Sequence, residues 1–178
     1  MPLVLLDRDG VINENAADYV KTADEWRPIP GSIDAIAALK RAGFVVAVCT
    51  NQSAIGRGLM DERMLTDVHR HMRDVLSARG VALDGIYHCP HSPDDACACR
   101  KPKPDMLLRA MRDLGSAPAE TVVVGDSLRD LKAAHAAGCR GVLVLTGHGH
   151  FHIADAARLG VEVFDDLASF AASRLARC

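Results

Sequence analysis

Short apolar runs alternate along the chain with segments whose apolar residues recur at helical spacing. Leu3 to Leu6 is a continuous apolar run that ends in charge, which predicts a strand buried on both faces of a sheet. Similar runs predict further strands at 44–48, 85–88, 121–124, 141–145 and 161–164. Helical periodicity predicts helices over 32–42, 61–79, 104–114, 128–137 and 167–175, and most of them stop at a glycine.

The alternation of strands and helices predicts the fold class. It is typical of an α/β protein with a Rossmann-like parallel sheet and helices on both faces. The sequence has no internal repeat, no low-complexity tract and no linker, so we expect one domain over residues 1–178. The first strand-to-helix connection, 10–30, is unusually long, and loops of that length in compact domains are usually functional. The spacing between the predicted elements leaves no room for a large cap domain.

Composition excludes several classes of partner. The 21 Lys and Arg residues nearly balance the 23 Asp and Glu residues, which argues against binding a nucleic-acid backbone. No apolar run approaches the roughly 20 residues that a membrane-spanning helix needs. The N-terminus lacks a basic leader, so we expect a cytoplasmic protein. With no apolar surface seam to nominate, we expect a monomer that binds a small molecule.

Polar residues follow each of the first four predicted strands. Ligands of open parallel sheets bind at this edge, outside the carboxyl ends of the strands. The four segments are Asp7-Arg8-Asp9-Gly10, Thr50-Asn51-Gln52-Ser53, a Cys/His cluster followed by Arg100-Lys101, and Gly125-Asp126-Ser127 with Asp130 one turn on.

The carboxylates among these residues predict a divalent cation site. Asp7 and Asp9 are two residues apart, so they point to the same side of an extended backbone. Carboxylates held together repel unless a cation relieves them, and Asp126 can converge on the pair from another strand end. Such oxygen ligands suit Mg²⁺. The alternative for Asp126 is a turn or capping residue.

A hydroxyl and two cations complete a set suited to phosphoryl transfer. Thr50 can donate to an anionic oxygen, Lys101 supplies a point charge, and Arg100 supplies a planar fork that matches phosphate. Phosphoryl transfer needs a nucleophile, a divalent cation and donors around the equatorial oxygens. The alternative for the basic pair is a solvated loop.

The Cys/His cluster predicts a structural zinc site. Cys89, His91, Cys97 and Cys99 form the pattern Cys-x-His-x5-Cys-x-Cys, which matches a closed tetrahedral Zn²⁺ site. Arg100 and Lys101 follow the last ligand directly, so the zinc loop would fix where these cations lie. A chance cluster is the alternative. We expect Cys49 and Cys139 to be small core residues and assign no role to Cys178.

The four motifs, in this order, resemble those of the haloacid dehalogenase (HAD) superfamily of phosphatases. The resemblance runs over nearly the whole chain. It implies that Asp7 is the nucleophile that forms an aspartyl phosphate and that Asp9 is the general acid and base. It further implies that Mg²⁺ is bound by Asp7, Asp126 and the backbone carbonyl of Asp9. Thr50 and Lys101 would stabilise the phosphoryl oxygens, and Asp130 would orient Lys101 or a metal-bound water.

The zinc loop resembles two groups within the superfamily, the heptose bisphosphate phosphatases of activated-heptose and lipopolysaccharide synthesis and the histidinol-phosphate phosphatases. The segment 50–58 and Tyr19 favour the first group, which implies hydrolysis of the C7 phosphate of a heptose 1,7-bisphosphate. The implied substrate contacts are Arg8, Asn15, Tyr19, Asn51, Gln52, Ser53, Arg57 and Arg100. Two features depart from the heptose group. The five-residue gap between the two pairs of zinc ligands is as short as in histidinol-phosphate phosphatases, which keeps histidinol phosphate as the alternative substrate. Ser127 stands where a Lys often follows the metal-binding Asp, which puts a phosphate contact in doubt.

Two other classes of protein share parts of this pattern. A receiver-type signalling domain also gathers Asp residues at strand ends, but it would carry its phosphoacceptor after the third strand. A catalytically inactive zinc module is a further alternative. We expect His69 and His71 to be surface residues and Trp26 to pack under the long loop or to line the pocket. The alternating His148, His150 and His152 are expected to face solvent, with a second metal site as the alternative.

Overall fold

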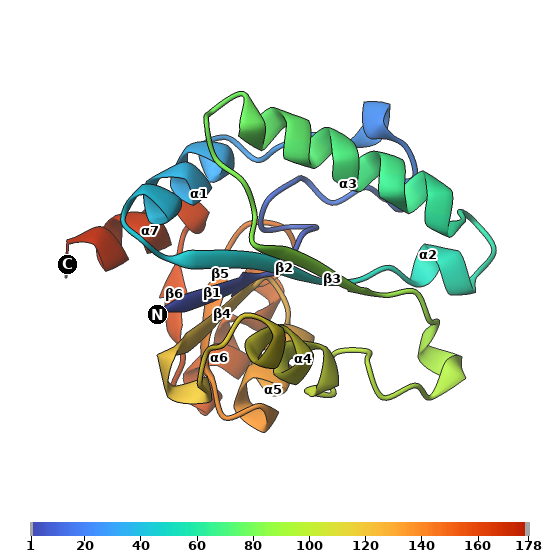
Figure 1. Ribbon diagram of the computed structural model, residues 1–178. Helices are drawn as coiled ribbons and strands as arrows, with labels where there is room; N and C mark the ends of the chain where they lie inside the picture. The colour runs from blue at the N-terminus through green and yellow to red at the C-terminus, as the bar shows by residue number, and fades with distance from the viewer. Residues whose placement is uncertain (1, 177–178) are drawn as a thin grey trace.

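The computed structural model describes residues 2–176 and builds them around a six-stranded sheet in which every pairing is parallel (Figure 1). The strands are β1 (Leu3–Leu6), β2 (Val45–Asn51), β3 (Gly85–Cys89), β4 (Thr121–Gly125), β5 (Arg140–Val144) and β6 (Glu162–Phe164). Their order in the sheet is β3-β2-β1-β4-β5-β6. The predicted α/β fold class is therefore confirmed. Cys178 lies outside the described residues.

Helices cover both faces of this sheet, as the alternation predicted. The helices are α1 (Ser32–Arg41), α2 (Ser53–Gly56), α3 (Glu62–Ser77), α4 (Asp105–Asp113), α5 (Leu128–Ala136), α6 (Ile153–Leu159) and α7 (Leu167–Leu175). Val4 and Leu6 of β1 pack in a core with residues of α1, α3 and α7, whereas Leu3 and Leu5 pack with α4 and α5. Figure 1 shows these two groups of helices on opposite sides of the sheet. In residues 2–176 no separate cap domain is inserted between the elements.

Two helices and one strand end differ from the prediction. The short helices α2 and α6 were not predicted, because each has few apolar positions and α6 buries only Ala156. Strand β2 continues to Asn51 rather than to residue 48, and Thr50 and Asn51 pair with His88 and Cys89 of β3. This longer pairing carries Thr50 and Asn51 alongside the start of the zinc loop.

The long connection from β1 to α1 is held down by buried polar contacts. Trp26 is 1% exposed, and its Nε1 donates a hydrogen bond to Asn13 Oδ1 at 3.0 Å. Trp26 therefore packs under the loop, which is one of the two positions predicted for it. His71 meets the Trp26 ring edge-on, at 5.6 Å between centroids. The prediction that His69 is a surface residue is wrong, because α3 packs against this region and leaves His69 only 7% exposed.

No helix within residues 2–176 combines the length and apolar character that crossing a bilayer requires.

Candidate active site

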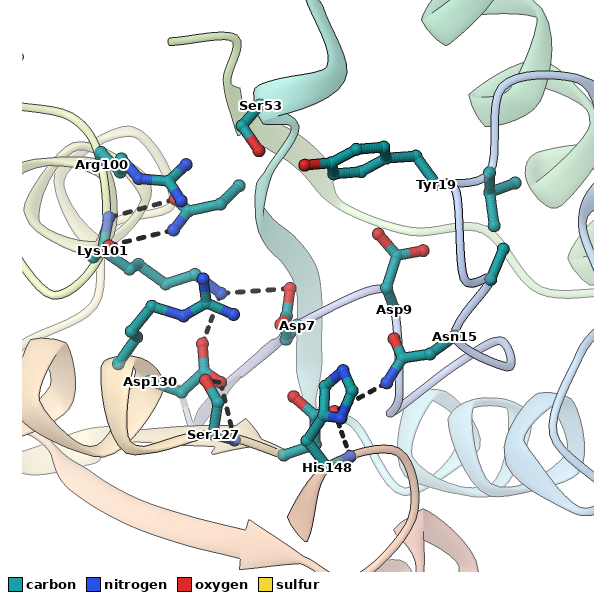
Figure 2. A pocket seen from close by; sticks show the side chains of 15 residues that line it. Asp7, Asp9, Asn15, Tyr19, Ser53, Arg100, Lys101, Ser127, Asp130 and His148 are labelled. Carbon is teal, nitrogen blue, oxygen red and sulfur yellow. Dashed lines mark hydrogen bonds and ion pairs between the residues drawn. The ribbon is translucent and has the colours of Figure 1, made fainter. Parts of the chain in front are cut away.

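A cavity of about 160 Å³ lies where β1, β2 and β4 end (Figure 2). Its wall includes most of the predicted site residues: Asp7, Asp9, Asn15, Tyr19, Asn51, Ser53, Arg100, Lys101, Asp126 and Asp130. Four segments that are far apart in the sequence are thus brought together at one edge of the sheet. This is the edge at which parallel α/β proteins bind ligands.

Lys101 is fixed in the cavity by three contacts. Its Nζ lies 3.1 Å from Asp7 Oδ1 and 2.6 Å from Asp130 Oδ1, and it donates a hydrogen bond to the Cys49 carbonyl at 2.7 Å. Burial lowers the pKa of Lys101, but the carboxylates of Asp130 and then Asp7 outweigh it and raise the pKa. Lys101 is therefore charged and directed at the oxygens of Asp7.

Asp130 acts on the site through Lys101 and the start of α5. Its Oδ1 faces Lys101, and its Oδ2 accepts hydrogen bonds from Ser127 N at 3.1 Å and Ser127 Oγ at 2.6 Å. Gly125 permits this approach, because a Cβ at Gly125 would lie 2.2 Å from the Asp130 Cβ. Of the two roles predicted for Asp130, this geometry favours the orientation of Lys101.

Asp7 lies at the end of β1 among other carboxylates. Its Oδ1 accepts a hydrogen bond from the backbone N–H of Arg8 at 2.8 Å, which together with Lys101 fixes the orientation of the carboxylate. Burial raises the pKa of Asp7 to about 7; Lys101 opposes this rise, and the charges of Asp130, Asp126 and Asp9 add to it. A buried carboxylate in such company is stabilised by a bound cation.

Asp126 approaches Asp7 from β4 and is held by the first loop and the loop after β5. Its Oδ2 accepts hydrogen bonds from His148 N at 2.9 Å and from Asn15 Nδ2 at 3.2 Å. Gly10 has a φ of +82°, and a Cβ there would lie 2.0 Å from Asp126 Oδ2. A glycine at position 10 is therefore required for both the turn and the close approach. Burial and the Asp130 charge raise the pKa of Asp126.

The oxygen atoms available in the cavity fit a hard divalent cation. One carboxylate oxygen from each of Asp7, Asp126 and Asp130 lies within 4.8 Å of the others. Both oxygens of Asp130 already contact Lys101 or Ser127, which leaves the carboxylates of Asp7 and Asp126 as the acidic ligands. Oxygen ligands of this kind suit Mg²⁺.

Asp9 is held by a buried network on the other side of the cavity. Arg8 Nη2 lies 2.9 Å from Asp9 Oδ1 and 3.0 Å from Oδ2, while Asn13 and Gln52 donate further hydrogen bonds at 2.9 and 3.0 Å. Arg8 Nη1 lies 3.3 Å from His69 Nε2. Burial raises the pKa of Asp9, but Arg8 and the two amide donors outweigh it, so the pKa is lowered.

The structure does not bring every predicted substrate contact to the cavity wall. Arg8 and Gln52 are 0% and 2% exposed and are bonded to Asp9, so they position this carboxylate and do not face the cavity. Arg57 is exposed and lies outside the wall. Thr50, which was predicted to stabilise the phosphoryl oxygens, is likewise absent from the wall: it is 1% exposed, and its Oγ1 accepts a hydrogen bond from Gln52 Nε2 at 2.9 Å.

The wall also contains residues that were not predicted as site residues, among them Arg129 and His148. His148 follows β5, so extending the strand-end rule to the fifth strand would have found it. His148 is exposed, as the sequence predicted, yet it lines the cavity. Arg129 lies in the first turn of α5, where a charged residue is typical of a solvated helix face and gives no signal of a site.

The predicted zinc ligands lie together at the end of β3 and in the loop that follows it. Five of the six distances between Cys89 Sγ, Cys97 Sγ, Cys99 Sγ and His91 Nδ1 are between 3.1 and 3.6 Å. A tetrahedral site with Zn–S bonds of about 2.3 Å has edges of about 3.8 Å between its ligands. The four atoms therefore fit the corners of a closed zinc site.

Comparisons with known proteins agree with this geometry. The family model of haloacid dehalogenase-like hydrolases matches residues 2–138. The D-glycero-beta-D-manno-heptose-1,7-bisphosphate 7-phosphatase of Pseudomonas aeruginosa is 48% identical over 173 residues, which cover 97% of each chain.

Solved structures show the same similarity. The D,D-heptose 1,7-bisphosphate phosphatase of Bordetella bronchiseptica, complexed with magnesium and phosphate, is 45% identical with a TM-score of 0.96, and the match covers 100% of both chains. The corresponding enzyme of Burkholderia thailandensis is 41% identical with a TM-score of 0.75 over 98% of this chain and 99% of that one. The chain therefore belongs to the family of haloacid dehalogenase-like hydrolases, and it is a phosphatase.

Proposed function

We propose that this phosphatase removes the C7 phosphate of D-glycero-D-manno-heptose 1,7-bisphosphate, in the synthesis of nucleotide-activated heptose, through an aspartyl phosphate on Asp7. The observation that carries the reaction type is the contact of buried Lys101 with Asp7 at 3.1 Å inside the cavity. The substrate is supported by the relatives from Pseudomonas and Bordetella, which match nearly the full length of both chains.

In the first half of the reaction a carboxylate oxygen of Asp7 attacks the phosphorus of the C7 phosphate. A bond forms between Asp7 and phosphorus, and the bond from phosphorus to the sugar oxygen breaks. Lys101 offers its charge to the equatorial oxygens of the transferring group, and Thr50 offers its hydroxyl. Because Asp130 and the Cys49 carbonyl hold Lys101 before substrate binds, this stabilisation needs little rearrangement.

Asp9 moves the proton in both halves of the reaction. It first protonates the leaving sugar oxygen, and it then takes a proton from the water that attacks the phosphorus and frees Asp7 together with inorganic phosphate. The donors from Arg8, Asn13 and Gln52 favour the ionised form that the second half needs. The first half needs the protonated form, which a phosphate dianion beside Asp9 favours by repulsion.

Mg²⁺ would be held by the carboxylates of Asp7 and Asp126, with the backbone carbonyl of Asp9 as the third predicted protein ligand. When bound, it neutralises the charge that builds up between the nucleophile and the phosphate. The raised pKa values of Asp7 and Asp126 support this assignment, because they reflect buried negative charge that a cation relieves.

Zn²⁺ would be held by Cys89, His91, Cys97 and Cys99 in a purely structural role. All four ligand positions come from the protein, so none remains open for a substrate. The loop has little core of its own, and zinc binding supplies the free energy that orders it. Its ordering matters for catalysis, because Arg100 and Lys101 follow Cys99 directly.

Two broader expectations belong to the same proposal. We place the protein in the cytoplasm, since the clustered thiols must stay reduced to bind zinc. We also expect a monomer, which light scattering after size-exclusion chromatography will test.

The decisive test is hydrolysis of two substrates side by side with Mg²⁺. We expect the heptose 1,7-bisphosphate to be hydrolysed over many turnovers with a kcat/KM well above that for histidinol phosphate, leaving heptose 1-phosphate. A strong preference for histidinol phosphate would instead assign the alternative function. Release of a single equivalent of phosphate, with no further turnover, would point to a receiver-type protein.

A further inference from the structure

A buried histidine on α3 touches the network around Asp9 without belonging to the metal site or to the phosphate-binding groups. His69 is 7% exposed, and its Nε2 lies 3.3 Å from Nη1 of Arg8. Figure 2 shows Asp9 across the active-site cavity from Lys101 and Asp130, so this network is separate from theirs. His69 does not line the cavity, and it can therefore act on Asp9 only through Arg8.

The guanidinium of Arg8 is fully buried, so each of its donors needs a partner inside the protein. Nε and Nη2 are directed at the oxygens of Asp9 at 2.9 to 3.1 Å, and Nη2 also reaches Gln52 Oε1 at 3.2 Å. Nη1 is the remaining nitrogen, and it contacts the ring of His69. Because the guanidinium is planar and rigid, His69 holds the corner that is turned away from Asp9.

The contact with Arg8 fixes the protonation state of His69. A guanidinium nitrogen only donates, so His69 Nε2 must accept, and the ring proton must be on Nδ1. Burial and then the charge of Arg8 lower the pKa of His69 to about 3, which agrees with a neutral ring. His88 packs against the His69 ring, with 6.1 Å between the centroids, and its own Nε2 lies 3.0 Å from Glu62 Oε2. The imidazole is therefore a held acceptor.

We propose that His69 is a positioning residue for the phosphatase reaction, which accepts a hydrogen bond from Arg8 and thereby holds the guanidinium against both oxygens of Asp9. The inference rests on the proposed function, because it takes Asp9 to be the group that transfers the proton. Without an acceptor at position 69, the buried Nη1 must turn toward another partner, and the guanidinium tilts away from Asp9. Asn13 and Gln52 still donate to Asp9, at 2.9 and 3.0 Å, so the loss is partial.

The test compares His69→Leu with His69→Gln. Leucine is a buried side chain without an acceptor, whereas Oε1 of glutamine can take the place of the imidazole Nε2. With heptose 1,7-bisphosphate we expect His69→Leu to lower kcat about tenfold, as for the loss of one hydrogen bond to a charged group, with KM within about twofold of the wild type. His69→Gln should restore kcat to within about threefold of the wild type.

The matched control is His135→Leu, because His135 is exposed on α5 and lies outside the wall of the active-site cavity. It removes a histidine without touching Arg8, so both constants should stay within about twofold of the wild type. His69→Phe, which keeps a ring but no acceptor, replaces His69→Leu if that protein does not fold.

A second substrate separates positioning of Asp9 from a general loosening of the site. p-Nitrophenolate leaves without a proton, so formation of the aspartyl phosphate does not need Asp9, whereas its hydrolysis does. In rapid mixing, His69→Leu should release nitrophenolate in the first turnover at a rate within about twofold of the wild type. The later turnovers should be about tenfold slower.

Equal losses in His69→Leu and His69→Gln, a loss confined to KM, or the same loss in His135→Leu would overturn the proposal. A first turnover slowed as much as the later ones would do so as well, and so would wild-type constants in His69→Leu. If the wild type hydrolyses p-nitrophenyl phosphate but not the heptose bisphosphate, the proposed function fails. The p-nitrophenyl phosphate measurement then still decides the role of His69, because it requires only that Asp9 assists hydrolysis of the intermediate.

Discussion

Asp9 belongs to a wall of the active-site cavity that is closed by buried hydrogen bonds, whereas Arg100 and Arg129 belong to a wall that is open to solvent. On the first side, Arg8 is fully buried and meets both oxygens of Asp9. On the second side, Arg100 directly follows the zinc loop and Arg129 lies in the first turn of α5. Neither arginine has a carboxylate partner among the described residues.

This difference separates two tasks. Groups that take part in bond making and breaking must already be oriented when the substrate arrives, and buried hydrogen bonds achieve this because water does not compete for them. Groups that recognise the rest of a charged substrate can remain solvated until the phosphate binds. Changes to the buried wall should therefore act mainly on kcat, and changes to the open wall mainly on KM.

The largest effect is expected for Asp7→Asn, which removes the nucleophile. We expect kcat to fall by at least about 10⁴-fold, as for the loss of other essential catalytic groups. The melting temperature of the metal-free protein should be unchanged or higher, because the change removes a buried carboxylate that lies near Asp9, Asp126 and Asp130. Turnover by this variant at a rate near that of the wild type would contradict the assignment.

A smaller loss is expected for Asp9→Asn, which leaves the nucleophile in place. With heptose bisphosphate we expect kcat to fall by about 10²- to 10⁴-fold, the usual size of general acid–base catalysis. With p-nitrophenyl phosphate the leaving group needs no proton, so rapid mixing should reveal a burst of about one equivalent of nitrophenolate before slow turnover. Slow release without a burst would show that Asp9 also serves the formation of the intermediate with a good leaving group.

The open wall should respond to Cys97→Ser, which removes a zinc ligand. We expect loss of bound zinc and a fall in kcat/KM of about tenfold, mainly through KM, because the loop no longer fixes Arg100 in the cavity wall. Cys139→Ser is the matched control, since Cys139 lies outside the cluster. A zinc-free Cys97→Ser protein with wild-type kcat and KM would show that the loop has no part in substrate binding.

The smallest effect concerns the buried wall beneath Asp9. Burial and the nearby Arg8 lower the pKa of His69 to about 3, whereas the unfolded chain binds a proton at its ordinary pKa of about 6.5. Below that value the unfolded state gains a proton that the folded state does not take up, so stability falls as the pH falls.

Between about pH 7 and pH 5 this difference should cost the wild type about 1 to 2 kcal/mol of unfolding free energy that His69→Gln does not lose. Urea denaturation at the two pH values, with His71→Gln as the control variant, measures it. An identical pH dependence in the wild type and His69→Gln would mean that His69 is protonated in the folded protein.

Much of the fold and the acidic half of the site follow from local sequence patterns. A continuous apolar run such as Leu3 to Leu6 predicts a buried strand without any further information. In a parallel sheet the residues that follow the strands must then meet at one edge. The zinc cluster is equally local, because all four of its ligands lie between residues 89 and 99.

The parts that were missed depend on tertiary packing. His69 is polar and lies on a helix, and only the packing of α3 near the first loop buries it against Arg8. Arg8 and Gln52 stand beside catalytic residues in the sequence, yet their side chains turn toward Asp9 and away from the cavity. Arg129 reaches the cavity wall because α5 begins there, which residue spacing does not reveal.

A crystal structure of the protein with Mg²⁺ and beryllium fluoride tests the role of Asp7 most directly, since this fluoride mimics a phosphoryl group bound to a carboxylate. We predict that the beryllium is bonded to a carboxylate oxygen of Asp7, that Lys101 and Thr50 contact the fluorines, and that the Mg²⁺ contacts both Asp7 and Asp126. A fluoride adduct bonded to another residue, or one that lies away from the Asp7 oxygens, would contradict the covalent mechanism.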